Sequence, residues 1–328
     1  MKKNTWKTVI FVALLIGAVA IQAQSVVLYS SNNSEAIANA VASARKKFPK
    51  LQVQSVTGGT GTLMARIRAE ASSPAGDIFW SGGVGTLAAY TDQMEPYQSS
   101  ESKAIAPQFR DPQNRFIGVN VHVMVLMVNE RQLKGLPLPK TWSDLMRPEW
   151  KGMFTMTDPA KSGTAFIQVY GLLKQFGRDG LEKILANAVV VQSSGQVYKS
   201  VAAGEYAAGL TTESAATEYV ADGQKEIKVV YPSEGAYLGA EGMFIVKGAR
   251  NLASAKQLYD VLLSKPTQEK LLQEQFRRPT RNDIAVSKLA GLPELSSLKV
   301  FPLNLQLATE EYEQVIALWN LALAKTRR

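Results

Sequence analysis

Short apolar runs alternate with amphipathic patterns through most of the chain. Three runs near the N-terminal end have the length of buried strands: 25–29, 51–56 and 77–80. A polar turn follows each run, and apolar residues then recur at the three- and four-residue spacing of one helix face. This repeated order of strand, turn and helix predicts a mainly parallel sheet, and therefore a fold of the α/β class.

One apolar run is too long for an ordinary strand. Valines alternate with other residues from 116 to 128, which is strand periodicity over more residues than an average strand holds. A strand of this length can leave one sheet and enter another. A second series of strands and helices follows it, with strands expected at 151–157, 188–192 and 206–210, and the strand expected at 242–246 returns the chain.

These patterns predict two lobes joined by a two-strand hinge. We expect the first lobe to contain residues 24–119 together with 242–328, including the C-terminal helices, and the second lobe to contain 128–238. The hinge strands are expected at about 119–128 and 238–242. Two mainly parallel sheets joined in this way can close around a ligand in the cleft between them.

The N-terminal segment has the pattern of a secretory signal peptide, predicted at 1–23. Three lysines precede the apolar run 8–21, and the small-residue stretch 18–23 closes it. The run is shorter than the roughly 20 apolar residues that span a bilayer. We expect cleavage after Ala23, with Ala20 as the alternative, and export of the mature chain to the periplasm.

The composition excludes several chemistries. The 328 residues include no Cys and one His. We therefore expect no disulfide, thiolate nucleophile, zinc knuckle or multi-His metal site. The formal charge is +9, but three lysines belong to the predicted signal peptide and three positive residues lie among the last four. The basic groups at 45–47 and at Arg277, Arg278 and Arg281 are interpreted as solvated helix ends or loop contacts. We therefore expect no nucleic-acid partner.

Five polar turns follow predicted strands and precede predicted helices. The first N–H groups of a helix have no internal partner and carry partial positive charge, so such turns can bind an anion without a basic side chain. The same residue types are also preferred helix caps, which is the alternative for any single turn. The predicted oxygen and N–H donors are Ser31, Asn32, Thr60, Gly61, Ser81, Gly82, Ser162, Gly163, Thr164, Ser194 and Thr212.

Motifs of common enzymes are missing. The turn containing Gly59 and Gly61 lacks the third glycine of a dinucleotide fingerprint, and no phosphate loop with Gly-Lys-Ser/Thr occurs. His122 has no G-x-S-x-G partner motif, so we interpret it as a structural or hinge residue. We expect neither catalysis nor a cofactor or metal; turnover that depends on His122 or on a carboxylate pair would indicate a hydrolase or transferase instead.

Several segments together resemble a known family. They include LYSSNNSEA from Leu28, VTGGTGTLMARIRAEASSPAGDIFWSGG from Val56 and RPEWKGMFTMTDPAKSGTAF from Arg147. In this order they are similar to periplasmic solute-binding proteins of ABC importers, in the branch shared by ferric-ion, phosphonate and sugar-phosphate binders. The resemblance runs from about Ser25 to Trp319. It implies a two-lobed type II binding-protein fold, a monomer that holds its ligand in the cleft, and delivery to a permease in the inner membrane.

The branch divides on the chemistry of the ligand. Its iron binders carry an adjacent tyrosine pair after the strand that aligns with 207–210, where this chain has Thr211, Thr212 and Glu213. We therefore favour a small phosphorylated or phosphonate anion, such as 2-aminoethylphosphonate or a sugar phosphate. Glu213 is predicted to pair with a ligand amine or to accept from sugar hydroxyls, and Tyr237 is a candidate cleft wall. A ferric-ion binder and a module that presents its ligand to a membrane sensor are the alternatives.

Overall fold

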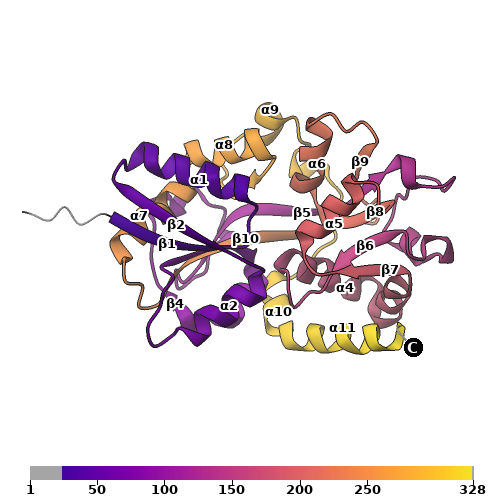
Figure 1. The fold of residues 1–328 in the computed structure, drawn as a ribbon, viewed down its shortest axis with the longest axis horizontal. Helices are drawn as coiled ribbons and strands as arrows, with labels where there is room; N and C mark the ends of the chain where they lie inside the picture. Colours follow the sequence, from indigo (N-terminus) through magenta and orange to yellow (C-terminus); the bar gives the residue numbers. More distant parts are fainter. Residues whose placement is uncertain (1–23, 327–328) are drawn as a thin grey trace, which may run out of the picture.

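The computed structural model describes residues 24–326, and the predicted signal peptide at 1–23 lies outside the described residues. Figure 1 shows two lobes side by side, with long strands running between them. No helix within 24–326 is long and apolar enough to cross a membrane.

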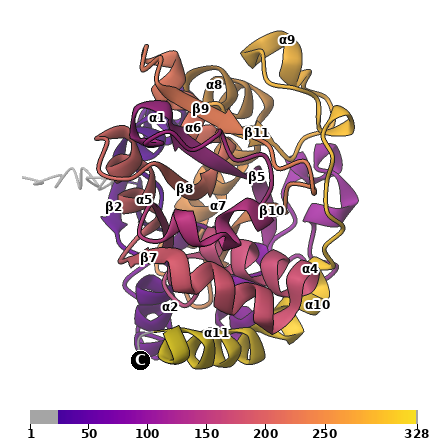
Figure 2. The same cartoon turned by 90° about the vertical axis from the view of Figure 1, so that its right-hand side faces the viewer.

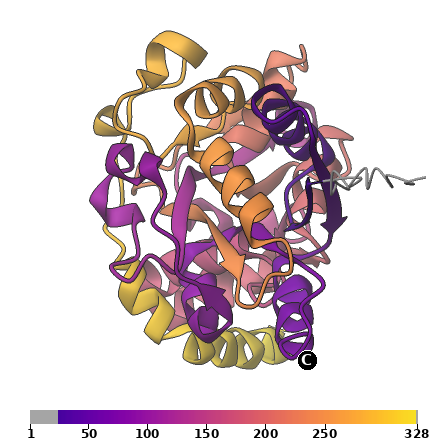
Figure 3. The same ribbon diagram turned by 90° about the vertical axis from the view of Figure 1, so that its left-hand side faces the viewer.

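The first lobe contains three parallel strands and the helices that cover them. Its strands are β1 (Gln24–Ser30), β2 (Leu51–Thr57) and β3 (Ile78–Gly83), and its helices are α1 (Ser34–Lys47), α2 (Thr60–Ala69), α3 (Val84–Leu87), α7 (Leu252–Leu263) and α8 (Lys265–Gln275). The helices α7 and α8, though distant in sequence, pack against α1 on one face, as Figure 3 shows from this end of the molecule.

The second lobe repeats this arrangement. Its strands are β6 (Phe154–Thr157), β7 (Ala188–Val191), β8 (Ala208–Thr212) and β9 (Ile227–Val230), and its helices are α4 (Gly163–Asn187), α5 (Ser194–Ala202) and α6 (Glu213–Ala221). Strand β6 is parallel to both β7 and β8. The α/β class predicted from the alternating pattern is therefore confirmed in both lobes.

Two long strands link the lobes. Strand β5 (Ile117–Asn129) pairs through its first half with β10 (Leu238–Val246), and through its second half with β8 and β9, always antiparallel. Strand β10 also pairs with β3, so the main path through the strands is β2-β1-β3-β10-β5-β8-β6-β7. The sheets of the two lobes therefore share β5. Nearly every residue of β5 is buried, which explains why its apolar run is so long.

The last helix does not belong to the first lobe, contrary to the prediction for 242–328. Helix α10 (Leu305–Glu310) contacts α3 of the first lobe, but α11 (Tyr312–Thr326) lies along α4 at the base of the second lobe, as Figure 2 shows. Trp319 of α11 is completely buried in the core of that lobe. The chain therefore crosses between the lobes a third time, through residues that follow β11 (Arg278–Pro279) and include α9 (Val286–Ala290).

The amphipathic pattern of α11 predicts an apolar stripe but not the surface that the stripe covers. Polar contacts just before the helix and in its last turn also tie it to α4: Glu311 lies 2.7 Å from Lys174, and Lys325 pairs with Glu182. The helix thus completes the second lobe rather than extending the first.

Replacing Trp319 with alanine should destabilise the second lobe. Removing a large buried aromatic leaves a cavity, and such changes lower the free energy of unfolding by about 3–5 kcal/mol. Leu321 on the same helix is 55% exposed and provides the control, with a change within about 0.5 kcal/mol expected for Leu321→Ala. Urea unfolding measures both variants. Hydrogen exchange should accelerate in α4 and not in α1; acceleration in α1 instead would contradict the placement of α11.

Candidate functional site

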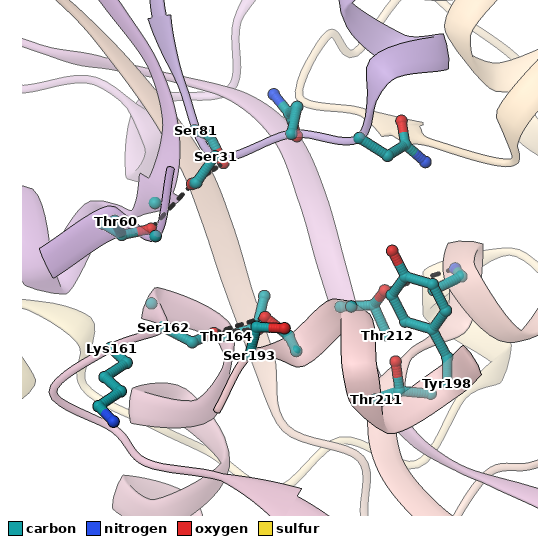
Figure 4. A pocket seen from close by; sticks show the side chains of 18 of the residues that line it. Ser31, Thr60, Ser81, Lys161, Ser162, Thr164, Ser193, Tyr198, Thr211 and Thr212 are labelled. Carbon is teal, nitrogen blue, oxygen red and sulfur yellow. Dashed lines mark hydrogen bonds between the residues drawn. The ribbon is translucent and has the colours of Figure 1, made fainter. Parts of the chain in front are cut away.

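A cavity of about 510 Å³ lies between the two lobes. Figure 4 shows that residues of both lobes point into it. Ten of the predicted site residues line this cavity: Ser31, Asn32, Thr60, Ser81, Gly82, Ser162, Gly163, Thr164, Ser194 and Thr212. The strand ends and turns that the sequence indicated separately thus surround a single space.

Five helices begin at this cavity, which concentrates helix N-termini there. Side chains cap four of them: Asn33 accepts from Ala36 N in α1, Ser162 from Ala165 N in α4, Ser193 from Gln196 N in α5 and Thr212 from Ala215 N in α6. The fifth helix, α2, follows Gly59 and has no side-chain cap. A cap satisfies only one of several free N–H groups, so capping and anion binding are compatible at the same turn.

Each lobe contributes a group of three hydroxyls. In the first lobe the Ser31 Oγ lies 2.9 Å from Thr60 Oγ1 and 2.7 Å from Ser81 Oγ, which links the ends of three strands.

In the second lobe the Ser162 Oγ lies 2.9 Å from both Thr164 Oγ1 and Ser194 Oγ. We call these six residues the two hydroxyl trios. Hydroxyl hydrogens rotate, so each trio can turn its donors toward an anion in the cavity.

A buried carboxylate at the hinge holds three residues of the cavity lining together. Glu241 of β10 is fully buried. Its oxygens accept hydrogen bonds from Asn32 Nδ2 at 2.8 Å and from Arg277 Nη1 at 2.8 Å, and His122 Nε2 lies 3.1 Å from one of them. Burial alone would raise the pKa of Glu241, but Arg277, His122 and Asn32 together hold that pKa below its usual range. The charge of Arg277 is thus largely matched by Glu241.

The structure places some residues at the cavity that the sequence did not predict. Arg277, interpreted as solvated, lines the cavity with a side chain only 10% exposed, and its Nη1 also donates to Asn32 Oδ1 at 3.0 Å. His122 does pack at the hinge, but it lines the cavity as well. Further unpredicted lining residues include Lys161, Gln192, Tyr198, Lys199, Thr211 and Glu218. No local motif marks them, because the fold brings them to the cleft from separate elements.

Glu213 was wrongly predicted to face the ligand. It is 1% exposed and pairs with Arg278, whose Nη2 lies 2.8 Å from Glu213 Oε1, and it also accepts from Tyr231. A buried carboxylate needs such partners, and here they come from β11 and from the residue that follows β9, neither of which lines the cavity. The pair also connects the second lobe to the strand that leads out of the first.

Two other predicted residues also lie outside the cavity lining. Tyr237 is fully buried in the second lobe, where its ring stacks on Trp142 with a 4.9 Å centroid separation and its hydroxyl donates to Gln175. Gly61 faces the opposite lobe instead: a Cβ at this position would lie 2.4 Å from the Ala160 oxygen. Likewise a Cβ on Gly163 would lie 2.2 Å from Gly83 N. The lobes therefore touch backbone to backbone at one edge of the cavity.

No group of three or more His, Cys, Asp and Glu side chains suited to a metal ion occurs within residues 24–326. At the place where iron binders of the resembled branch carry paired tyrosines, β8 ends in Thr211 and Thr212. Together with the two hydroxyl trios, this lining suits an oxyanion better than a hard cation.

Comparison with known proteins gives a consistent match. The family model described as bacterial extracellular solute-binding protein matches residues 72–303. A protein of Haemophilus influenzae described only as uncharacterized is 30% identical over 233 residues, covering 65% of this chain and 66% of that protein. The Fe(3+)-binding periplasmic protein of Serratia marcescens is 23% identical, covering 89% of this chain and 86% of its own.

Two further matches concern phosphorus-containing ligands. A putative 2-aminoethylphosphonate-binding periplasmic protein of Salmonella typhimurium is 24% identical, covering 74% of this chain and 73% of that protein. The structure of the periplasmic binding protein AfuA from Actinobacillus pleuropneumoniae, with fructose-6-phosphate bound, is 26% identical, with a TM-score of 0.85. It covers 92% of this chain and 98% of that one.

Replacing Gly61 with alanine should prevent full closure of the cleft. The new Cβ would collide with the backbone oxygen of Ala160, while Gly58→Ala on the same turn meets only the Leu63 side chain at 3.4 Å and provides the control. Alanine suits a helix better than glycine, so α2 itself should tolerate the change.

Spin labels at the exposed positions Lys47 and Lys183 measure the separation of the lobes, and the absence of native cysteines makes Lys47→Cys and Lys183→Cys the only labelled sites. With bound ligand, Gly61→Ala should give a longer distance than the parent and Gly58→Ala the same distance. An unchanged distance in Gly61→Ala would show that this contact does not limit closure.

Proposed function

Because the chain belongs to the bacterial extracellular solute-binding proteins, we propose that it captures a small phosphorylated or phosphonate anion in the periplasm and delivers it to the permease of an ABC importer. Members of this family bind solutes and are not enzymes. The proposal adds the class of solute and the compartment to that general role.

The convergence of helix starts from both lobes carries the proposal. Five helices begin at the cavity, so their free N–H groups and positive ends face one space from two sides. The two hydroxyl trios add donors that are neutral and close together. A phosphate or phosphonate group carries several acceptor oxygens, and this arrangement can satisfy them without a large cluster of basic side chains.

The size of the cavity supports an organic ligand. A volume of about 510 Å³ lies within the range of roughly 300–1,000 Å³ that is typical of small-molecule sites. A single ferric ion would fill little of this space. The names of the Salmonella and Actinobacillus proteins point in the same direction, while the Serratia protein keeps ferric ion as the alternative to be tested.

Isothermal titration calorimetry should show binding of phosphonates or phosphate esters and no comparable binding of ferric citrate. We expect a dissociation constant of about 1 μM or below for the best ligand, which corresponds to roughly −8 kcal/mol. Tight ferric binding without heat from any phosphorus compound would overturn the proposal.

Thr60→Val tests the hydroxyl trios directly. It removes one hydroxyl that lines the cavity and nearly preserves the shape, so affinity should fall roughly 10- to 100-fold, as for a lost hydrogen bond to a charged group. Thr217→Val on α6 is the matched control, because Thr217 does not line the cavity. The titration of both variants with the best ligand decides the matter; equal losses in the two variants would argue against a role for the trio.

A further inference from the structure

We propose that the cavity contains a second subsite, formed by Glu218, Tyr198 and Thr211, which accepts hydrogen bonds from the part of the ligand that is remote from its phosphorus. This inference rests on the proposed function and narrows it to ligands that carry an ammonium or hydroxyl group as well as the anion. It also transfers to Glu218 the recognition role that the sequence had suggested for Glu213.

Glu218 is the acidic residue of α6 that lines the cavity. Within residues 24–326, its carboxylate has no hydrogen-bond or ion-pair partner, unlike Glu213, which Arg278 and Tyr231 satisfy. A partly buried carboxylate without a partner is costly to keep charged, and a donor on the ligand would relieve that cost.

Thr211 provides a second and independent observation. The residue is only 3% exposed, yet it lines the cavity, so the little of its surface that is accessible belongs to the cavity wall. Figure 4 shows Thr211 and Tyr198 on the same side of the cavity, the side of the second lobe. The Tyr198 hydroxyl lies 3.4 Å from the position of a Cβ on Gly195, so this ring reaches back to the first turn of α5. It therefore borders both the helix starts and the proposed subsite.

The charges around Glu218 favour a donor over a second anion. Burial raises the pKa of Glu218 to about 7, Arg277 opposes the rise, and Glu35 and Asp222 add to it. The pKa of Tyr198 is raised by its own burial, by Tyr219 and by Glu218, while Arg277 lowers it. Arg277 already donates to Glu241 at 2.8 Å, so its charge is shared. The cavity lining also includes Lys161 and Lys199, and Glu218 is its acidic residue.

This distribution of charge favours one orientation of the ligand in the cavity. A phosphorus group is repelled by the Glu218 carboxylate and attracted by the helix starts and the hydroxyl trios. The end of the ligand that is remote from its phosphorus then lies toward Glu218. One anionic and one donating end would fix both the orientation and the selectivity of binding.

Three phosphonates of nearly equal size test the subsite: ethylphosphonate, 2-hydroxyethylphosphonate and 2-aminoethylphosphonate. Calorimetry with the mature full chain should show that at least one of the two donating ligands binds roughly 10- to 100-fold more tightly than ethylphosphonate, the range expected for a hydrogen bond to a charged group. Equal binding of all three would overturn the subsite while leaving the anion proposal intact. If no phosphorus compound binds while another ligand does, both proposals fall.

Two variants of Glu218 separate the sources of that gain. Glu218→Gln should abolish the gain in affinity that an ammonium group gives over ethylphosphonate, because the charge is lost. It should retain most of the gain in affinity that a hydroxyl group gives, because the amide oxygen still accepts a hydrogen bond. Glu218→Ala should abolish both gains. Glu35→Gln, a nearby carboxylate that does not line the cavity, should change either gain less than threefold. Gains that persist in both Glu218 variants would overturn the assignment, and retained ethylphosphonate binding shows that each variant is folded.

The pH dependence provides a further check on the ammonium. Above a pKa of about 7 the Glu218 carboxylate is charged and attracts an ammonium group, and below it the carboxyl is neutral. The ratio of 2-aminoethylphosphonate to ethylphosphonate affinity should therefore rise several-fold more from pH 6 to pH 8 in the parent chain than in Glu218→Gln, because the different titrations of the two phosphonates enter both chains equally. The same pH dependence of the ratio in both chains, despite an ammonium gain in the parent, would contradict an ion pair with Glu218.

Discussion

Strand β5 supplies backbone hydrogen bonds to both lobes, because its first half pairs with β10 and its second half with β8 and β9. Its side chains alternate between different cores: Val123 and Val125 pack in one cluster, while Met124 and Leu126 pack in another. A shift of one residue in register would exchange these faces and place His122 on the wrong side of the sheet. The placement of the two halves of the cavity relative to each other therefore depends on the register of this strand.

The buried carboxylate of Glu241 fixes the same region by electrostatics. It gathers Asn32 from the first strand–helix turn, His122 from β5 and Arg277 from the end of α8. Taking one donor away would leave a charge buried without compensation, which is far more destabilising than losing an exposed ion pair. Because the network belongs to the hinge strands and also lines the cavity, a ligand that contacts it acts on the part of the chain about which the lobes would move.

Local patterns in the sequence were sufficient for most of the strands, the turns and the α/β class, since each depends on residues a few positions apart, but they missed the short strands β9 and β11. They could not assign α11 to a lobe, because an apolar stripe on a helix does not show which surface the helix packs against. They also could not distinguish Glu213 from Glu218, which lie on the same helix. The two carboxylates differ in the folded chain because Arg278 of β11 pairs with the buried Glu213, whereas Glu218 lines the cavity.

The structure explains how binding and closure can depend on one another. Each hydroxyl trio and each set of helix starts belongs to a single lobe, so an open cleft offers an anion only half of its donors. Closure brings the second half within reach, and the ligand thus interacts more strongly with the closed form, which is the condition for shifting the population toward it. At Gly61 the backbones of the two lobes already meet, since a Cβ there would lie 2.4 Å from the Ala160 oxygen. Neutral donors suit this task, because two lobes lined with uncompensated positive charge would repel each other before the anion arrived.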